Sequence, residues 1–284
     1  MLKSLNNLRS KIVQVLDTPP QITDLKDIIL YDRSRAVQAS HPNPLNQFGK
    51  KCFSQTDEDG ITLEILKRMG MLRAAGAYAE FGVEDGTENN SLILAAMKWK
   101  GFWVGSDNLK FNVQGKHKRF AYLKEWVTLK NISSIAQQGI SAIGVAELDV
   151  ISLDLDGNDI YFVDELLKSG FRPKLFIVEY NGKFPPPIEF QIAYDDRNIW
   201  QGDDYFGAFL SSFLKMFTGY DYRLICCNAH SGANAFFIDA RYLSLFPDVP
   251  SEIENIYVAP RYHLYNQYGH KKSVRTIERL FEAD

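Results

Sequence analysis

The sequence of 284 residues has only three cysteines and lacks the paired cysteine and histidine spacings of disulfide frameworks and metal sites. Two of the cysteines, Cys226 and Cys227, are adjacent, and a bridge between them would need a strained ring. There is no C-x-x-C or H-E-x-x-H motif, and the five histidines show no ligand spacing. These absences argue against a disulfide-stapled fold and a structural zinc site, and we expect a reducing, cytoplasmic compartment.

A long basic run and a long apolar run are also missing. With 32 basic and 35 acidic residues the net charge is −3, which argues against a nucleic-acid partner. The first sixteen residues are amphipathic but too polar for a signal peptide or a transmembrane segment. We expect them to form a surface helix that docks on the protein, and the alternative is peripheral contact with a membrane.

The composition is that of a soluble globular protein with a sizeable core, at 45% hydrophobic and 24% charged residues. Residues 1–50 are expected to be a helical N-terminal extension, with helices over 4–16 and 23–38 that end before proline-containing loops. Residues 51–284 are expected to form one domain, which opens with a helix over 56–69.

From residue 77 onward, strand and helix patterns alternate. We expect strands over 77–83, 101–107, 121–128, 149–156 and 174–181, with helices over 89–99 and 159–170. Such alternation predicts parallel β-α-β units, whereas 222–228 and 234–240 predict an antiparallel hairpin at the sheet edge. The predicted fold is therefore α/β and Rossmann-like, with helices on both faces of a mostly parallel sheet. Ligands in such folds bind at the carboxyl ends of the strands.

The first strand ends in a turn that combines two glycines, Gly82 and Gly86, with three acids, Glu80, Glu84 and Asp85. A dinucleotide-binding turn would have the pattern G-x-G-x-x-G and would hold a pyrophosphate. Carboxylates repel a pyrophosphate, but they attract the ammonium and sulfonium cations of S-adenosylmethionine. The turn therefore favours S-adenosylmethionine over NAD, and the alternative is an ordinary connection with helix-capping acids.

The fourth and fifth predicted strands end in acidic side chains. Asp154 and Asp156 are two residues apart, so on a continuing strand they would point to the same face. Glu179 and Asn181 end the neighbouring strand with the same spacing. These oxygens could hold Mg²⁺ or supply a general base for a substrate hydroxyl. The alternative is that Asp156 and Asp159 only cap the following helix.

Two further polar residues are weaker candidates. Asp107, after the second predicted strand, could hold ribose hydroxyls, or it could be a turn or N-cap residue. His230, in the predicted hairpin turn, could act as a base near neutral pH, or it could be a solvated loop residue. Four aromatic residues form either a substrate wall or plain core: Phe190, Tyr194, Tyr205 and Phe206.

Several of these motifs together resemble a bacterial family, the FkbM-like S-adenosylmethionine-dependent methyltransferases. The matching segments are S-Q-T-D-E-D-G-I (54–61), E-F-G-x-x-D-G (80–86), L-D-L-D-G-N-D (153–159), I-V-E-Y-N (177–181), Y-F-G-A (205–208) and G-A-N-A-F-F-I (232–238). The resemblance spans about residues 50–243. It implies a Rossmann-like methyltransferase sheet, S-adenosylmethionine as donor, and a sugar, polysaccharide or other small-molecule acceptor. The donor-binding residues assigned with it are Gln55, Glu80, Gly82, Asp85, Gly86, Asn89, Asp107 and Asp154.

Two positions depart from the pattern of the family. Glu84 stands where many methyltransferases have a small residue, and Gly105 stands where relatives carry the acid that ends the second strand. The leading hypothesis is methyl transfer to a hydroxyl, in which Asp154, Asp156, Glu179 and His230 are the catalytic candidates. Two alternatives stay open: a degenerate, non-catalytic binding or scaffold protein, and a metal-dependent hydrolase or lyase. A homo-oligomer is compatible with each.

Overall fold

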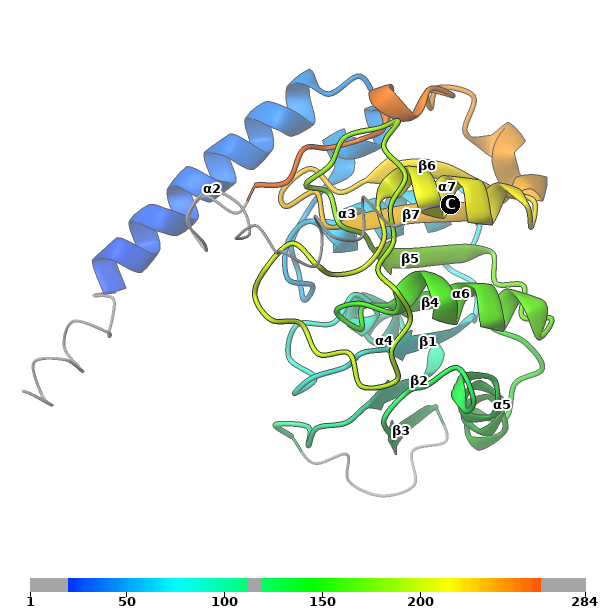
Figure 1. Ribbon diagram of the computed structural model, residues 1–284. Coiled ribbons are helices and arrows are strands. Elements are labelled where there is room, and N and C mark those ends of the chain that lie inside the picture. The colour runs from blue at the N-terminus through cyan, green and yellow to red at the C-terminus, as the bar shows by residue number, and fades with distance from the viewer. Residues whose placement is uncertain (1–19, 112–118, 262–284) are drawn as a thin grey trace, which may run out of the picture.

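A seven-stranded sheet forms the centre of the protein in the computed structural model, which describes residues 20–111 and 119–261 (Figure 1). The strands follow the order β3-β2-β1-β4-β5-β7-β6 across the sheet. Their bounds are β1 Ala77–Phe81, β2 Lys100–Gly105, β3 Phe120–Lys124, β4 Val150–Leu153, β5 Leu175–Glu179, β6 Tyr222–Cys227 and β7 Asn234–Asp239. The helix expected over 4–16 lies outside the described residues.

The first five strands are parallel and the last two are antiparallel to their neighbours. The predicted hairpin is confirmed, but β7 lies between β5 and β6, so only β6 is the edge strand. Phe81 on β1 pairs with Leu153 on β4, and Leu153 pairs in turn with Val178 on β5. The carboxyl ends of β1, β4 and β5 are therefore level with one another.

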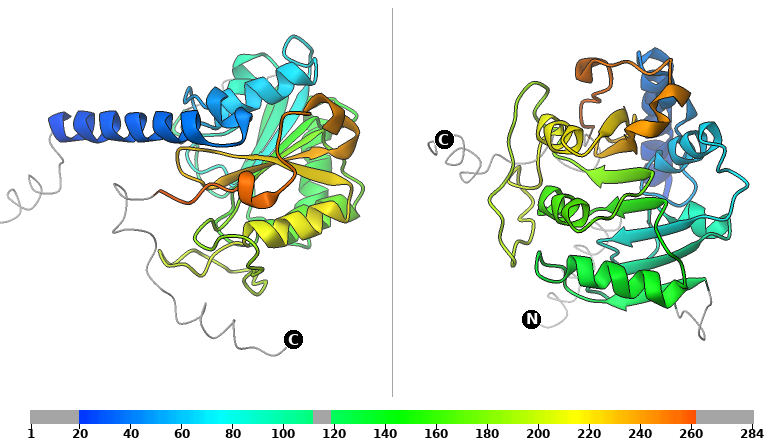
Figure 2. Two further views of the ribbon diagram at one scale, coloured as in Figure 1. Left: turned by 90° about the horizontal axis from the view of Figure 1, so that it is seen from above. Right: turned by 90° about the vertical axis from the view of Figure 1, so that its right-hand side faces the viewer.

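Helices cover both faces of the sheet, as the views in Figure 2 show. One face packs on α5 Ile132–Ile143, α6 Asp159–Lys168 and α7 Leu210–Thr218. The other face packs on the 3-10 helix η1 Pro44–Phe48, α3 Glu58–Arg68 and α4 Leu92–Ala96. Side chains alternate between these two cores along the strands, so that Ile151 faces the first core and Val150 the second. The predicted fold class is confirmed: a Rossmann-like α/β sheet with helices on both faces, mostly parallel with an antiparallel pairing at one edge.

The N-terminal part of the described chain is attached through buried amide side chains. Helix α2, Pro20–Ser40, extends away from the sheet in the left view of Figure 2, and its inner end is held by Gln38, whose Nε2 donates to Asp57 Oδ2 at 2.9 Å. Asn43 and Asn46 each donate to a carbonyl of β6 at 2.7 Å. Two 3-10 helices, η2 Ala240–Leu245 and η3 Ile253–Asn255, follow the last strand.

In the described ranges, no helix combines the length and the apolarity that crossing a membrane requires.

Gly105, one of the two departures from the family pattern, lies at the end of β2. A Cβ atom on Gly105 would lie 1.9 Å from the Val83 carbonyl oxygen, so no side chain fits at this position. We expect Gly105→Ala to lower the free energy of unfolding by about 3 kcal/mol, because the backbone of two neighbouring strand ends must separate. Urea unfolding measures the loss.

Gly144→Ala is the control for this substitution. Gly144 has a φ of +62°, and a Cβ there meets no atom within 4 Å, so only the cost of the left-handed backbone, about 1–2 kcal/mol, is expected. Equal losses in both variants would contradict the close approach at Gly105.

Candidate functional site

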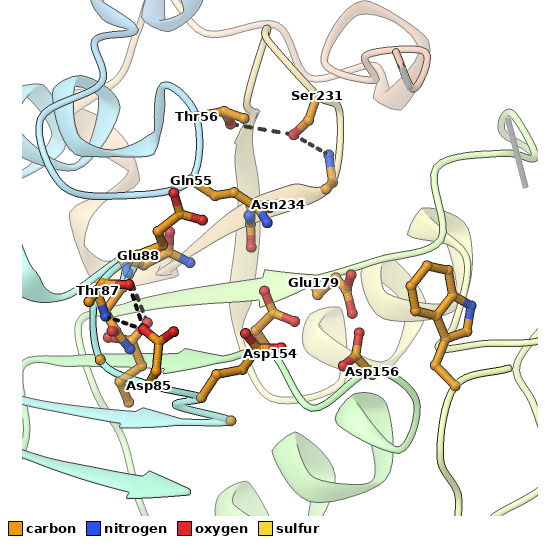
Figure 3. A pocket seen from close by; sticks show the side chains of 18 of the residues that line it. Gln55, Thr56, Asp85, Thr87, Glu88, Asp154, Asp156, Glu179, Ser231 and Asn234 are labelled. Carbon is orange, nitrogen blue, oxygen red and sulfur yellow. Dashed lines mark hydrogen bonds between the residues drawn. The ribbon is translucent and has the colours of Figure 1, made fainter. Parts of the chain in front are cut away.

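A cavity of about 350 Å³ opens at the carboxyl ends of β1, β4 and β5 (Figure 3). Its volume is within the range of about 300–1,000 Å³ that small-molecule sites occupy. Most of the residues singled out from the sequence line it: Gln55, Glu80, Gly82, Asp85, Gly86, Asn89, Asp154, Asp156 and Glu179. Asp107 and His230 do not.

The side chain of Glu80 is buried and organises the turn after β1. Its carboxylate accepts hydrogen bonds from the backbone N–H groups of Asn90 and Ser91, at 2.9 and 3.0 Å, and from the Ser91 hydroxyl. Trp103 Nε1 donates to the same hydroxyl at 2.8 Å. Burial raises the pKa of Glu80. Asn90 and Ser91 directly precede α4, so the Glu80 carboxylate places a buried acid at the entrance to that helix, where it would repel a phosphate.

The other two acids of the turn differ in their surroundings. Asp85 pairs with Lys110, Nζ to Oδ2 at 2.7 Å, and accepts the Thr87 N–H at 3.0 Å, which holds the pKa of Asp85 below its usual value. Partial burial and the nearby charge of Asp156 raise the pKa of Glu84. Glu84 lines the cavity, so this departure from the family pattern lies in the site itself.

The two glycines of the turn line the cavity, and close packing leaves no room for a side chain at either position. Gly82 has a φ of +93°, and a Cβ there would lie 1.6 Å from the backbone oxygen of Asp154. Gly86 has a φ of +82°, and a Cβ there would lie 2.9 Å from the side chains of Leu109 and Phe111. The close approach at Gly82 brings the ends of β1 and β4 together at the cavity.

Asp107 and His230 are held elsewhere by local contacts. Strand β2 ends at Gly105, two residues before Asp107, and the Tyr122 hydroxyl donates to the Asp107 carbonyl at 2.6 Å. The turn that carries His230 is fixed by Asp57, whose Oδ1 accepts the His230 N–H at 3.0 Å. Neither Asp107 nor His230 is among the residues that line the cavity.

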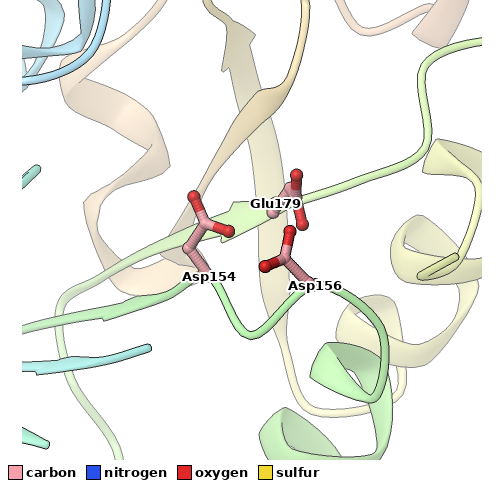
Figure 4. A group of neighbouring side chains, drawn as sticks. All are labelled: Asp154, Asp156 and Glu179. Carbon is pink, nitrogen blue, oxygen red and sulfur yellow. The ribbon is translucent and has the colours of Figure 1, made fainter. Parts of the chain in front are cut away.

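Asp154, Asp156 and Glu179 come together at the centre of the site (Figure 4). Each offers an oxygen, and these atoms lie within 4.8 Å of one another. The reason predicted for this was wrong: β4 ends at Leu153, and Asp156 has a φ of +54°, so a turn rather than a continuing strand brings its carboxylate to the others. Glu179 Oε2 is buried without a hydrogen-bond partner in the described part of the chain.

These three carboxyl groups bind protons more tightly than they would in water. Burial, followed by repulsion from one another and from Asp159, raises the pKa values of Asp154 and Glu179 well above their usual range. Burial also raises the pKa of Asp156. Such a cluster favours a bound cation or a shared proton.

Asp159 begins α6, and its side chain holds the backbone of the turn before that helix, the kind of structural role that the sequence left open. Its carboxylate accepts the backbone N–H groups of Leu155 and Gly157, at 2.9 and 3.1 Å, and burial raises its pKa to about 6. No such capping contact is found for the Asp156 side chain among the described residues. Asp159 therefore shapes the turn that presents Asp154 and Asp156.

The acids of the segment 54–61 support the opposite wall of the cavity rather than lining it. Asp59 Oδ2 accepts the backbone N–H groups of Cys52, Phe53 and Ser54 at 2.6–2.9 Å. Glu58 accepts the Thr56 N–H at 3.0 Å and the Asn234 amide at 3.1 Å. These bonds fix the backbone on which Gln55 and Thr56 line the cavity.

Several lining residues were not identified from the sequence: Thr56, Thr87, Glu88, Asn90, Trp200, Ser231, Ala233, Asn234 and Arg261. Phe206, one of the four aromatic candidates, also lines the cavity. Trp200 lies near it, with ring centroids 5.9 Å apart, on the long connection between β5 and α7. An aromatic wall beside the three carboxylates is thus part of the site.

No family model matches the chain, and no curated protein matches it significantly in sequence. Two solved structures are weakly similar. A proposed hemolysin from Lactococcus lactis is 8% identical, with 66% of this chain and 90% of that chain covered and a TM-score of 0.40. The methyltransferase MycE of the mycinamycin biosynthetic pathway, solved with Mg, SAH and mycinamycin VI, is 11% identical, with 64% of this chain and 46% of that chain covered and a TM-score of 0.33.

Similarities of this size establish neither a family nor a function. The chain spans less than half the length of MycE. The resemblance to the FkbM-like family therefore stays a prediction, and what the site does has to be argued from its own geometry.

The raised pKa values of Asp154 and Glu179 predict how stability changes with pH. Their protonated forms are favoured in the folded state, so this stabilisation is complete below the unfolded pKa values and is lost as pH rises through the folded ones. We expect the free energy of unfolding, measured with urea in the presence of a chelator, to fall as the pH rises above about 4, the pKa of such carboxyl groups in the unfolded chain. Glu179→Gln should reduce that fall.

Glu254→Gln, at an exposed position, is the matched control and should leave the pH dependence unchanged. An equal fall in the Glu179→Gln variant and in the unmodified protein would show that this cluster does not govern the effect.

Proposed function

We propose that this protein is an S-adenosylmethionine-dependent methyltransferase that acts on a hydroxyl group of a small-molecule or carbohydrate acceptor. The observation that carries the proposal is the charge of the cavity at the strand ends. Seven acidic residues line it: Glu80, Glu84, Asp85, Glu88, Asp154, Asp156 and Glu179. A ligand with cationic groups fits such a lining, whereas a pyrophosphate does not.

The donor would lie along the turn after β1. Gly82 and Gly86 allow the backbone to approach it, and Gln55, Asn89 and the other acids of the turn offer polar contacts. Of the remaining assigned residues, Glu80 holds the turn itself, and this proposal moves Asp154 from the donor to the acceptor. The Glu80 carboxylate directly before α4 supports this assignment, because the phosphates of a dinucleotide would lie against that buried acid. Asp107 lies outside the lining, so the proposal gives it no contact with the donor.

The acceptor would lie between Asp154, Asp156 and Glu179 and the aromatic wall. An ionised carboxylate there can take the proton of the acceptor hydroxyl while its oxygen attacks the methyl carbon. As the new carbon–oxygen bond forms, the carbon–sulfur bond breaks and the sulfur keeps its electron pair. Holding the two substrates in line supplies much of the acceleration.

The same three residues fit Mg²⁺, because the ion prefers carboxylate oxygens and one oxygen of Glu179 is buried without a partner in the described residues. When bound, the ion would lower the pKa of a hydroxyl at this place. The carboxylates would then orient the acceptor rather than take its proton. A metal-dependent hydrolase or lyase is the second candidate function, favoured by this cluster alone.

The first test is calorimetric titration of the protein with S-adenosylmethionine, S-adenosylhomocysteine and NAD, with and without Mg²⁺. We expect micromolar dissociation constants for the first two ligands and no binding of NAD, because the acidic lining repels a pyrophosphate. A folded protein that binds neither adenosyl ligand would favour the degenerate scaffold. Activity that needs metal but no methyl donor would favour the hydrolase or lyase.

The second test is the substitution Asp154→Asn, assayed by transfer of a labelled methyl group to a panel of sugars and small hydroxyl compounds. We expect transfer to fall by about 100-fold or more, because a general base contributes roughly that much, while donor affinity changes little. Asp32→Asn, at an exposed position on α2, is the control. Undiminished transfer by Asp154→Asn would remove this residue from the mechanism.

A further inference from the structure

Arg261 is the one basic side chain among the described residues that line the cavity. It follows η3 near the end of the described chain, far in sequence from every motif of the site. Its backbone N–H donates to the Ser231 carbonyl at 3.0 Å, which places it beside the turn between β6 and β7. No sequence pattern around residue 261 indicated a role.

The guanidinium of Arg261 is partly buried but has no carboxylate within ion-pair distance in the described ranges. Within residues 20–111 and 119–261 the guanidinium makes one hydrogen bond, at 3.4 Å from Nη1 to the backbone carbonyl of Arg33. Burial, followed by the positive charge of Arg33, lowers the pKa of Arg261. Removing a cation from water without a partner is costly, so an unpaired arginine at a cavity wall is suited to an anionic group of a ligand.

The surroundings of Arg261 differ from the rest of the lining. Figure 3 shows Thr56 and Ser231, whose hydroxyl oxygens are 3.4 Å apart, at one end of the cavity and the three central carboxylates, Asp154, Asp156 and Glu179, away from them. The backbone contact with Ser231 puts the backbone of Arg261 next to the hydroxyl end, and its guanidinium lies against α2, where it donates to the Arg33 carbonyl. The cavity therefore offers an arginine and neutral polar groups at one end and carboxylates at the other.

We propose that Arg261 binds the carboxylate of the amino-acid portion of S-adenosylmethionine. This inference rests on the proposed function and extends it to a residue that fixes the orientation of the donor. The donor has two cationic groups, an ammonium and a sulfonium, and one carboxylate. Seven acids alone would attract the first two and repel the third, so a donor with all three groups needs a cation at one end of the cavity.

The test compares ligands with and without this carboxylate. S-Adenosylmethionine, its decarboxylated form, which differs from it only in the carboxylate, and S-adenosylhomocysteine are titrated into the unmodified protein, Arg261→Met, Arg261→Lys and Arg33→Met. Since charge-assisted hydrogen bonds are strong, we expect Arg261→Met to weaken binding of the two ligands that carry the carboxylate by about 10- to 100-fold. It should leave binding of the decarboxylated ligand unchanged or slightly stronger, and Arg261→Lys should lie in between.

Arg33→Met is the matched control, because Arg33 is an exposed neighbour of Arg261 that does not line the cavity. It removes the same charge nearby and should change none of these affinities. Circular dichroism and thermal melting confirm that each variant is folded.

The outcomes separate this inference from the proposed function. If the unmodified protein binds S-adenosylhomocysteine and Arg261→Met binds it equally well, this inference is overturned and the proposed function stands. An equal loss for S-adenosylmethionine and its decarboxylated form also overturns it, because the arginine then acts without the carboxylate. Variants that change only acceptor binding assign Arg261 to an acceptor anion instead. If no adenosyl ligand binds to the unmodified protein, both proposals fall.

Discussion

The hydrogen bonds of Glu80 determine the character of the site. In a dinucleotide fold, the helix after the first strand points its free N–H groups at a pyrophosphate. Here the buried carboxylate of Glu80 takes the N–H groups of Asn90 and Ser91, so the protein supplies its own anion at that place. The turn from residue 82 to residue 91 is thereby fixed, and the cavity in front of it is lined by further acids, of which Asp85 is paired with Lys110. A ligand for this cavity has to bring positive charge.

The wall that faces this turn depends on a second set of buried acids. Asp57, Glu58 and Asp59 are consecutive and all buried, and each accepts hydrogen bonds from backbone or amide groups. Asn228, at the end of β6, donates to Asp57 and Glu58 at 3.1 and 3.0 Å, which joins the start of α3 to the β6–β7 turn. Buried carboxylates that lose such partners are costly, so the whole network holds together or not at all. Gln55, Thr56 and Ser231 reach the cavity only because this network places their backbone.

The sequence predicted the sheet better than its details. The five parallel strands, the antiparallel hairpin and the helices on both faces followed from alternating patterns, since short apolar runs between turns leave few other arrangements. Helices α5 and α7 were not predicted, although Ile132, Ile135, Ile140 and Ile143 have the spacing of an apolar helix face. The insertion of β7 between β5 and β6 is a long-range pairing for which the sequence holds no local signal.

The candidate site was also predicted in part. Strand-end residues such as Asp154 and Glu179 were predictable, because parallel strands bring their carboxyl ends to one edge of the sheet. The backbone that brings Asp156 to the other two carboxylates is not the predicted strand. It is a turn with a left-handed residue at Asp156, which an alternating pattern cannot predict. Arg261 was missed because its position depends on how the chain returns after β7, and Asp107 was assigned to the site because β2 was expected to be two residues longer.

The cost of the acidic lining suggests why such a site is kept. Burial and mutual repulsion raise the pKa values of Asp154 and Glu179, so in the empty protein these groups oppose the stability of the fold at neutral pH. A local conflict of this kind between side-chain chemistry and stability is expected where function requires it. A cationic ligand or metal ion relieves the repulsion only when it binds, so part of the energy stored in the empty site becomes binding energy. The repulsion that destabilises the empty cavity is thus the same interaction that would select a positively charged donor over a neutral or anionic competitor.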